Sequence, residues 1–309
     1  MRRLFLLLLI SPCAVIAQQK EIPRDTSFTV YSSYIKEKKK YSFIEIVRSS
    51  LPGNVKVSQN IAYISYGDRS LLLDVFYPAG KIKEGYPGVL LIHGGGWRSG
   101  DRSQCIPFAQ QLAAKGYVAV TAAYRLSPEA IYPAALDDLK AAITWMRSYA
   151  IMYQMDTARI AVLGFSAGGQ LAALLGTANH NSSRVHAIVD IDGILAFHHP
   201  ESAEGAVAAA WLGGTYEEKR EVWKEASALN HVSRTTPPVL FINSSLPRFH
   251  AGREDMIKKM DSLKIYSEVH TLPDTPHPFW LFHPWFDPTV KFTTGFLDQV
   301  LKNKKEKTE

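Results

Sequence analysis

The sequence predicts an α/β fold built on a mostly parallel central sheet with helices on both of its faces. Short apolar runs recur along most of the chain, and segments with helical patterning lie between them. The runs are apolar throughout, which is typical of strands buried on both faces of a parallel sheet. The first two runs flank Gly67-Asp68, a hairpin signal, so we expect the sheet to begin with an antiparallel pair.

The expected elements follow in a regular order. We expect strands at 61–65, 71–77, 89–92, 117–122, 160–163, 187–191, 239–242 and 267–272. We expect helices at 133–149, 171–176 and 255–263. The stretch 194–235 interrupts this alternation of strands and helices, and it is interpreted as an excursion over the functional site. With 309 residues, 46% of them hydrophobic, and no visible linker, the chain suits one large domain.

The N-terminus has the order of residues that is typical of a signal peptide. Arg2 and Arg3 precede an apolar run at 4–9, and small or apolar residues lead up to Ala17. The run is about half of the ~20 residues that a membrane-spanning helix needs. We therefore expect residues 1–17 to be cleaved, the protein to be exported to the periplasm of a Gram-negative bacterium, and no stable membrane insertion.

Cleavage changes both the cysteine count and the charge. Cys13 is removed, so Cys105 is left alone and no intramolecular disulfide can form. The whole chain has a net charge of +6, and the loss of two arginines and no acid leaves +4. This mild basic excess does not support nucleic-acid binding but is compatible with an acidic substrate. The polar, irregular residues 18–58 are expected to be an extension packed on a main α/β domain at 59–303.

The run GFSAG at 164–168 fits the nucleophile-elbow pattern G-x-S-x-G. An apolar strand ends at Leu163 and a small-residue helix begins at Ala167, which is the context that the elbow needs. The turn lifts the Ser166 hydroxyl above the sheet, and flanking glycines prevent clashes. A glycine-rich turn that merely contains Ser is the alternative, and the context disfavours it. The run therefore predicts an α/β-hydrolase fold with Ser166 as nucleophile.

A second glycine-rich run, HGGGW at 93–97, follows the strand at 89–92. In acyl transfer, backbone N–H groups stabilise the negative charge that develops on the carbonyl oxygen. We expect the N–H groups of Gly95, Gly96 and Ala167 to form this oxyanion site, and Trp97 to contact substrate. An ordinary tight turn after the strand is the alternative.

The general base is expected to be a late histidine, because this fold orders its triad as Ser, acid, His. His277 follows the last predicted strand and is the candidate. His270 lies within that strand and is expected to be structural, and His283 comes six residues after His277. His198 and His199 lie in the excursion, where one of them is a candidate for substrate contact.

The acid of the triad is harder to assign. It commonly follows the strand at 239–242, but the next residues contain no carboxylate. Asp192 ends the preceding strand and Asp255 lies further along the loop, and we favour Asp192 over Asp255. Asp190 is deeper in its strand, and Asp274 is too near His277 in sequence.

Basic residues stand where that acid is usually found. Arg248, His250 and Arg253 crowd into 247–253, on the side where the site is expected to open. Arginine binds carboxylates through paired hydrogen bonds, so this cluster favours an anionic substrate over simple surface solubility.

Four aromatic residues follow His277, and they are candidates for either a sugar-stacking wall or core. They are Phe279, Trp280, Phe282 and Trp285.

Three segments carry a family resemblance: HGGGWRSGDR at 93–102, YRLS at 124–127 and GFSAGG at 164–169. Together they resemble the bacterial carbohydrate-esterase branch of the α/β-hydrolases, near the hormone-sensitive-lipase-like and feruloyl-esterase-like groups. The segment 243–253, followed by PHPFW at 276–280, more particularly resembles the α/β-hydrolase-type pectin methylesterases of gut Bacteroides. The missing acid after the strand at 239–242 departs from the wider superfamily.

The resemblance implies a serine ester hydrolase that acts on plant cell-wall glycan. The implied substrate is an anionic, pectin-derived oligosaccharide, whose galacturonate methyl ester is cleaved to galacturonate and methanol. An acetylesterase acting on pectin or xylan would use the same triad and stays open. A peptidase and a non-catalytic sugar-binding protein are remoter alternatives. Neither a metal nor a cofactor is expected, since the sequence contains no H-x-E-x-x-H pattern and no cysteine pair for a metal.

Overall fold

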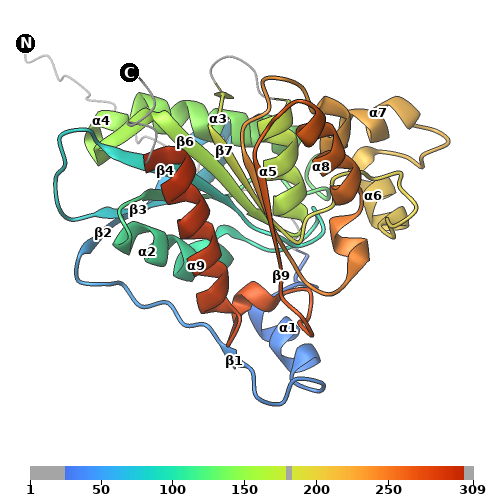
Figure 1. Cartoon of the computed structure of the whole chain (residues 1–309), viewed down its shortest axis with the longest axis horizontal. Coiled ribbons are helices and arrows are strands. Elements are labelled where there is room, and N and C mark those ends of the chain that lie inside the picture. Colours follow the sequence, from blue (N-terminus) through green and yellow to red (C-terminus); the bar gives the residue numbers. More distant parts are fainter. Residues whose placement is uncertain (1–24, 179–182, 303–309) are drawn as a thin grey trace, which may run out of the picture.

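The computed structural model describes residues 25–178 and 183–302. The predicted signal peptide at 1–17 lies outside the described residues. In the part of the chain that is described, an eight-stranded sheet is covered by helices (Figure 1). The predicted α/β-hydrolase fold class is confirmed.

The bounds of the elements are as follows. The strands are β1 (Glu45–Ile46), β2 (Val55–Tyr66), β3 (Arg69–Pro78), β4 (Tyr86–Ile92), β5 (Val118–Ala122), β6 (Met155–Phe165), β7 (Ala187–Ile191), β8 (Val239–Asn243), β9 (Ser267–Thr271) and β10 (Phe282–His283). The α-helices are α1 (Val30–Glu37), α2 (Ile106–Ala114), α3 (Ala134–Ser148), α4 (Ala150–Tyr153), α5 (Ala167–Thr177), α6 (Gly205–Leu212), α7 (Arg220–Glu225), α8 (Arg253–Ser262) and α9 (Phe286–Leu297). None of these described helices has the length and apolar composition needed to cross a membrane.

The large sheet has the strand order β2-β3-β5-β4-β6-β7-β8-β9. β3 pairs antiparallel with both β2 and β5, and every later neighbouring pair is parallel. The predicted antiparallel hairpin is therefore confirmed. It begins earlier than the sequence predicts, because Val55 already pairs with Pro78, so residues 55–58 belong to the sheet and not to the extension.

The sheet separates two apolar cores. Side chains of α3, α5 and α8 are buried in one core, and those of α2 and α9 in the other. β4 is buried along its whole length, which is why its sequence is apolar throughout. The parallel strands β4, β6, β7 and β8 end at the same edge of the sheet, where ligands bind in open α/β sheets.

The N-terminal extension is more regular than its sequence suggests. α1 begins after Thr29, whose hydroxyl accepts a hydrogen bond from the Ser32 N–H, while the Ser32 hydroxyl accepts one from the Thr29 N–H. This reciprocal capping box stabilises the first turn of a short helix. β1 then pairs antiparallel with β10. Figure 1 shows α1 at the lower edge of the molecule, beside the loop that follows β9.

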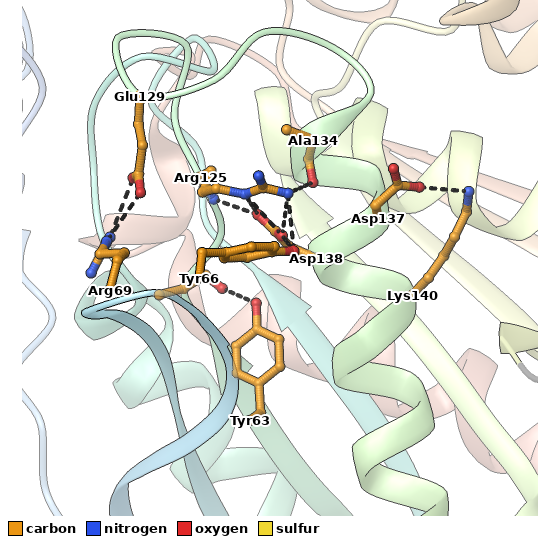
Figure 2. Close-up of polar contacts among 10 residues, drawn as sticks. Tyr63, Tyr66, Arg69, Arg125, Glu129, Ala134, Asp137, Asp138 and Lys140 are labelled. Atoms are coloured by element: carbon orange, nitrogen blue, oxygen red, sulfur yellow. Dashed lines mark hydrogen bonds and ion pairs between the residues drawn. The ribbon is translucent and has the colours of Figure 1, made fainter.

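A polar network joins the β2–β3 hairpin to α3 (Figure 2). The fully buried carboxylate of Asp138 accepts hydrogen bonds from the Arg125 side chain at 2.8–3.1 Å and from the Tyr66 hydroxyl at 2.6 Å. The Arg125 guanidinium also lies over the Tyr66 ring, 3.8 Å from its centroid. The network fixes the loop that follows β5.

Replacing Asp138 with Ala is expected to lower the free energy of unfolding by about 3–5 kcal/mol, because the largely buried Arg125 loses its charge partner. The loss would be measured as a lower urea midpoint, with an unchanged slope m of the unfolding free energy against urea concentration. Asp137→Ala is the matched control on the same helix: the Asp137 side chain is 54% exposed and pairs with Lys140, so its loss should cost about 0–1 kcal/mol. Equal losses in the two variants would contradict the structural role of the network.

Candidate active site

Ser166 stands at the tip of a sharp turn between β6 and α5. Its backbone has φ 54° and ψ −120°, a strained conformation that costs on the order of 1–3 kcal/mol. A hydrogen bond of 2.8 Å from the Ser166 N–H to the Ile191 carbonyl holds the turn. Gly164 is required beside it, since a Cβ there would lie 1.8 Å from the Gly168 carbonyl oxygen. This is the strand–turn–helix geometry of a nucleophile elbow.

Three side chains from three different loops form one chain of hydrogen bonds. His277 Nε2 lies 2.7 Å from Ser166 Oγ, and His277 Nδ1 lies 2.7 Å from Asp192 Oδ2. The other carboxylate oxygen of Asp192 accepts a hydrogen bond of 2.9 Å from the Ser244 N–H. The arrangement allows the imidazole to take the hydroxyl proton while the carboxylate fixes its tautomer.

Asp192, and not Asp255, therefore contacts the imidazole. The Asp255 side chain lies in the first turn of α8, is 52% exposed, and pairs with Lys258 at 3.1 Å and with His199 at 3.5 Å. These contacts fit the alternative interpretation of Asp255 as a helix N-terminal residue. Neither His199 nor its neighbour His198 lines the cavity at Ser166.

The His277 imidazole lies between two aromatic rings. Phe249 stacks on it with centroids 3.4 Å apart and an interplanar angle of 9°, and Trp280 meets it edge-on at 5.4 Å. These contacts restrict rotation of the imidazole and keep both nitrogens directed at their partners. The contact with Phe249 could not be predicted from the sequence, because no local pattern brings residue 249 to residue 277.

The aromatic run after His277 is core and not a sugar-stacking wall. Phe279, Trp280 and Phe282 are at most 4% exposed and pack in the core beneath α2 and α9. Trp285 packs edge-on against Tyr41 of the extension, with ring centroids 5.3 Å apart. The run therefore anchors the His277 loop to the body of the protein.

A second buried carboxyl group, that of Asp190, lies close to Asp192. Its Oδ1 accepts a hydrogen bond of 3.0 Å from the Gly193 N–H. Burial, and then the neighbouring Asp192 charge, raise the pKa of Asp190 well above its ordinary value. This favours the neutral, protonated form of Asp190 beneath the site.

The glycine loop after β4 borders the same cavity as the Ser166 hydroxyl. Gly95 has φ +129°, and a Cβ there would lie 2.1 Å from the Ser99 carbonyl oxygen, so a larger residue would displace the loop. Gly96 also lines the cavity. Ala167 begins α5, where backbone N–H groups have no partner within the helix. Gly95 and Gly96 thus line the cavity and Ala167 directly follows Ser166, and the oxyanion role of all three stays a prediction.

His93 supports the glycine loop from behind. It is 2% exposed, and its ring stacks on Tyr124 with centroids 4.4 Å apart. The Tyr124 hydroxyl donates a hydrogen bond of 2.9 Å to the His93 carbonyl. Burial lowers the pKa of His93 to about 4, so its ring is neutral at neutral pH.

A cavity of about 660 Å³ opens beside Ser166 and His277, within the range of small-molecule sites, which is about 300–1,000 Å³. Its walls come from the N-terminal extension, the glycine loop, the start of α6 and the loops after β8 and β9. Four of the residues that line it are cationic, and three are anionic. The cationic residues are Lys36, Lys40, Arg98 and Arg248, and the anionic ones are Glu37, Glu204 and Asp274.

Arg248 is the predicted substrate-binding residue that lines this cavity. Its side chain is 50% exposed, and its guanidinium lies 4.3 Å from the Phe249 ring centroid and 3.7 Å from the Glu204 carboxylate. Arg248, Phe249 and His277 therefore form a continuous stack at the cavity wall.

The prediction that Trp97 contacts substrate is wrong. Trp97 is 2% exposed, because the chain turns inward after the glycines at φ 59°. Its indole stacks on Trp211 with centroids 5.1 Å apart, and its Nε1 donates a hydrogen bond of 2.9 Å to Gln170. Through these contacts with Gln170 and Trp211, Trp97 holds the glycine loop against α5 and α6.

The predictions for His250 and Arg253 are also wrong. His250 is 9% exposed, and burial lowers its pKa. Arg253 donates a hydrogen bond of 2.7 Å to the Asn243 side chain and pairs with Glu254 at 2.6 Å. Neither residue lines the cavity. The Arg253 side chain is held against the end of β8 by its hydrogen bond to Asn243.

Within residues 25–178 and 183–302, no group of three or more His, Cys, Asp or Glu side chains is arranged to hold a metal ion.

Comparison with known protein families matches residues 73–248 to the model named BD-FAE. The match covers more than half of the chain and includes the glycine loop, Ser166 and Asp192. The chain belongs to the BD-FAE family of α/β-hydrolase esterases.

Curated relatives of this BD-FAE chain include two proteins of Mycobacterium tuberculosis. Esterase LipC is 32% identical over 200 residues, which are 59% of this chain and 50% of LipC. The probable carboxylic ester hydrolase LipM is 28% identical over 243 residues, which are 71% of this chain and 56% of LipM. The chain thus spans about half the length of these curated relatives.

Solved structures similar to this BD-FAE chain share its fold. A truncated carbohydrate esterase from gut microbiota superposes with a TM-score of 0.64 at 24% identity, covering 78% of this chain and 96% of that one. A bifunctional GH43-CE protein of Bacteroides eggerthii gives a TM-score of 0.68 at 24% identity, and the match covers 79% of this chain and 38% of that protein. Esterase B of Lactobacillus Rhamnosis gives a TM-score of 0.69 at 20% identity, and the match covers 90% of this chain and 95% of Esterase B.

Proposed function

We propose that this protein is an exported serine carboxylic ester hydrolase that removes methyl groups from galacturonate in pectin fragments. The observation that carries the proposal is the hydrogen-bonded chain of Ser166, His277 and Asp192, which borders a cavity lined by four cationic and three anionic side chains. Membership of the BD-FAE family supports the ester chemistry. The predicted signal peptide supports export to the periplasm.

The first half of the reaction forms an acyl-enzyme. Ser166 Oγ attacks the ester carbonyl carbon while His277 Nε2 takes the hydroxyl proton. The N–H groups of Gly95, Gly96 and Ala167 stabilise the oxyanion of the tetrahedral intermediate. The intermediate collapses by breaking the bond to the methoxy oxygen, and His277 gives its proton to the departing methanol.

The second half repeats these steps with water. His277 takes a proton from a water molecule, whose oxygen attacks the acyl carbon and forms a second tetrahedral intermediate. Collapse breaks the bond to Ser166 Oγ, which recovers its proton from His277. The product is the free galacturonate carboxylic acid, which ionises at neutral pH, and the enzyme returns to its starting state.

The choice of a methyl ester on an acidic sugar rests on the cavity. When a methyl ester is cleaved, the sugar is the acyl group and must stay beside Ser166 until water arrives. The cavity at Ser166 is large enough for sugar rings, and Arg248 on its wall suits a neighbouring carboxylate. The two carbohydrate-esterase structures of the same fold, one from gut microbiota, are in keeping with a glycan substrate.

The decisive measurement compares methanol and acetate released from native pectin that carries both groups. We expect methanol to be released about tenfold faster or more, which corresponds to about 1.4 kcal/mol of transition-state discrimination. Acetate release without methanol would instead establish the acetylesterase alternative. The Ser166→Ala variant serves as the blank for both products.

A further inference from the structure

Helix α1 of the N-terminal extension presents a polar face to the active-site cavity. Ser32, Ser33, Lys36 and Glu37 line the cavity, and Lys40, four residues beyond Lys36, continues the same line. Positions four apart lie one above the other on a helix, so Ser32, Ser33, Lys36 and Glu37 form one face of α1. Lys40 lies in the turn that follows the end of α1.

The other faces of α1 carry its apolar residues. Val30 and Tyr34 are partly buried against the core, whereas the apolar Tyr31 and Ile35 are 67% and 46% exposed. The residue of α1 that is most buried is the polar Ser33. Val30 and Tyr34 thus hold α1 against the core, as in other surface helices. The polar side of α1, with the buried Ser33 and the exposed Ser32 and Lys36, borders the cavity and fits contact with a polar ligand.

The extension is fixed to both loops that supply the candidate catalytic groups. Asp25 forms a bridge with Ser99 and an ion pair with Arg98, which directly follow the HGGGW run. At its other end, the Tyr41 ring packs edge-on against Trp285 with centroids 5.3 Å apart, and β1 pairs with β10, in the segment that follows His277. α1 is therefore held in place relative to the reacting groups and is a wall of the site.

The lysines on this wall are able to exchange their partners for a ligand. The Lys36 side chain is 81% exposed and lies 3.6 Å from Glu37. The Lys40 side chain is 69% exposed and pairs with Asp274 at 3.2 Å. Ion pairs exposed to this degree contribute little to stability, because water screens both charges. A substrate carboxylate can therefore bind these ammonium groups without disrupting a strong internal contact.

We propose that α1 and the turn after it form an anion-binding subsite, in which Lys36 and Lys40 hold a substrate carboxylate that is separate from the ester at Ser166. This rests on the proposed ester hydrolysis and names the class of substrate as one that carries at least one free carboxylate besides its ester. The subsite acts on binding and takes no part in proton transfer at Ser166.

The test measures inhibition of p-nitrophenyl acetate hydrolysis by unesterified trigalacturonate. The ester is small and neutral, so it reports on Ser166 and His277 without needing the subsite. In the Lys36→Ala/Lys40→Ala double variant we expect the inhibition constant to rise about tenfold, the size of effect expected for two partly exposed charge-assisted contacts. The kcat for p-nitrophenyl acetate should stay unchanged, which also shows that the variant is folded.

The matched control is the Lys39→Ala/Lys83→Ala variant, which removes the same charge from two exposed lysines that do not line the cavity. Its inhibition constant should equal that of the wild type. The Lys36→Arg/Lys40→Arg variant should retain inhibition, because arginine also binds carboxylates. An unchanged constant in the Lys36→Ala/Lys40→Ala variant, or an equal rise in the control, would overturn the subsite.

Failure of the subsite and failure of the proposed function give different results. If methylated pectin yields methanol but the lysine variants bind trigalacturonate like the wild type, the subsite is refuted and the methylesterase stands. If the constant rises as expected but no methanol is released, the subsite stands and the assigned ester is wrong.

Discussion

Replacing Ser166 with Ala is expected to lower kcat for ester hydrolysis by about 10⁶-fold, the loss seen when a serine hydrolase is deprived of its nucleophile. Without Oγ, His277 has no hydroxyl to deprotonate and no acyl-enzyme can form. A residual rate of about 10³–10⁴-fold over the uncatalysed reaction should remain, because the oxyanion donors can still act on a water-attacked ester. The measurement is initial-rate hydrolysis of p-nitrophenyl acetate, with the variant produced free of wild-type enzyme.

Two controls separate lost chemistry from lost folding. The urea midpoint of Ser166→Ala should stay close to that of the wild type, because the Ser166 side chain is not part of the core. Alanine would adopt the same positive-φ backbone conformation at this position as serine does. Ser148→Ala makes the same substitution at the end of α3, where the hydroxyl bonds only within its helix to the Thr144 carbonyl, and it should leave kcat unchanged. A Ser166→Ala variant that turned over ester at the wild-type rate would show that Ser166 is not the nucleophile. A wild type with no turnover above the uncatalysed rate would favour the non-catalytic sugar-binding alternative.

The sheet and the Ser166 turn could be predicted from the sequence because their causes are local. A strand that is apolar throughout is buried wherever it lies, and G-x-S-x-G needs its glycines within five residues. Gly164 shows this directly, since its missing side chain makes room for the Gly168 carbonyl only four residues away. Such short-range requirements are visible in a single sequence.

Substrate contacts could not be predicted in the same way, because they depend on packing between distant segments. Trp97 and Arg253 lie beside the site in sequence, yet Gln170 and Asn243 hold their side chains away from the cavity. Lys36 and Lys40 lie far from any motif and reach the cavity because α1 folds back onto the loops that follow β4 and β9. The spacing of Ser32, Lys36 and Lys40 at four residues was the available sign of a polar helix face.

The acid of the triad gives the second large expected effect, and two aspartates provide a matched comparison. Asp192→Asn is expected to lower kcat by about 10⁴-fold, whereas Asp255→Asn should leave kcat unchanged and lower the urea midpoint only slightly, through its place at the start of α8. Both substitutions keep the size of the side chain and remove one charge. Initial rates with p-nitrophenyl acetate and urea midpoints would be measured for both variants.

The physical reason lies in the two hydrogen bonds of the Asp192 carboxylate. Its Oδ1 accepts from the Ser244 N–H, so in the Asn variant the amide oxygen must stay there and the NH₂ group must face His277 Nδ1. Nδ1 then becomes an acceptor and the imidazole proton moves to Nε2. In that tautomer Nε2 cannot take the proton of Ser166, and the imidazolium formed during attack also loses its counter-charge. A large loss in Asp255→Asn with little change in Asp192→Asn would show that the hydrogen bond from His277 to Asp192 is not the one used in catalysis.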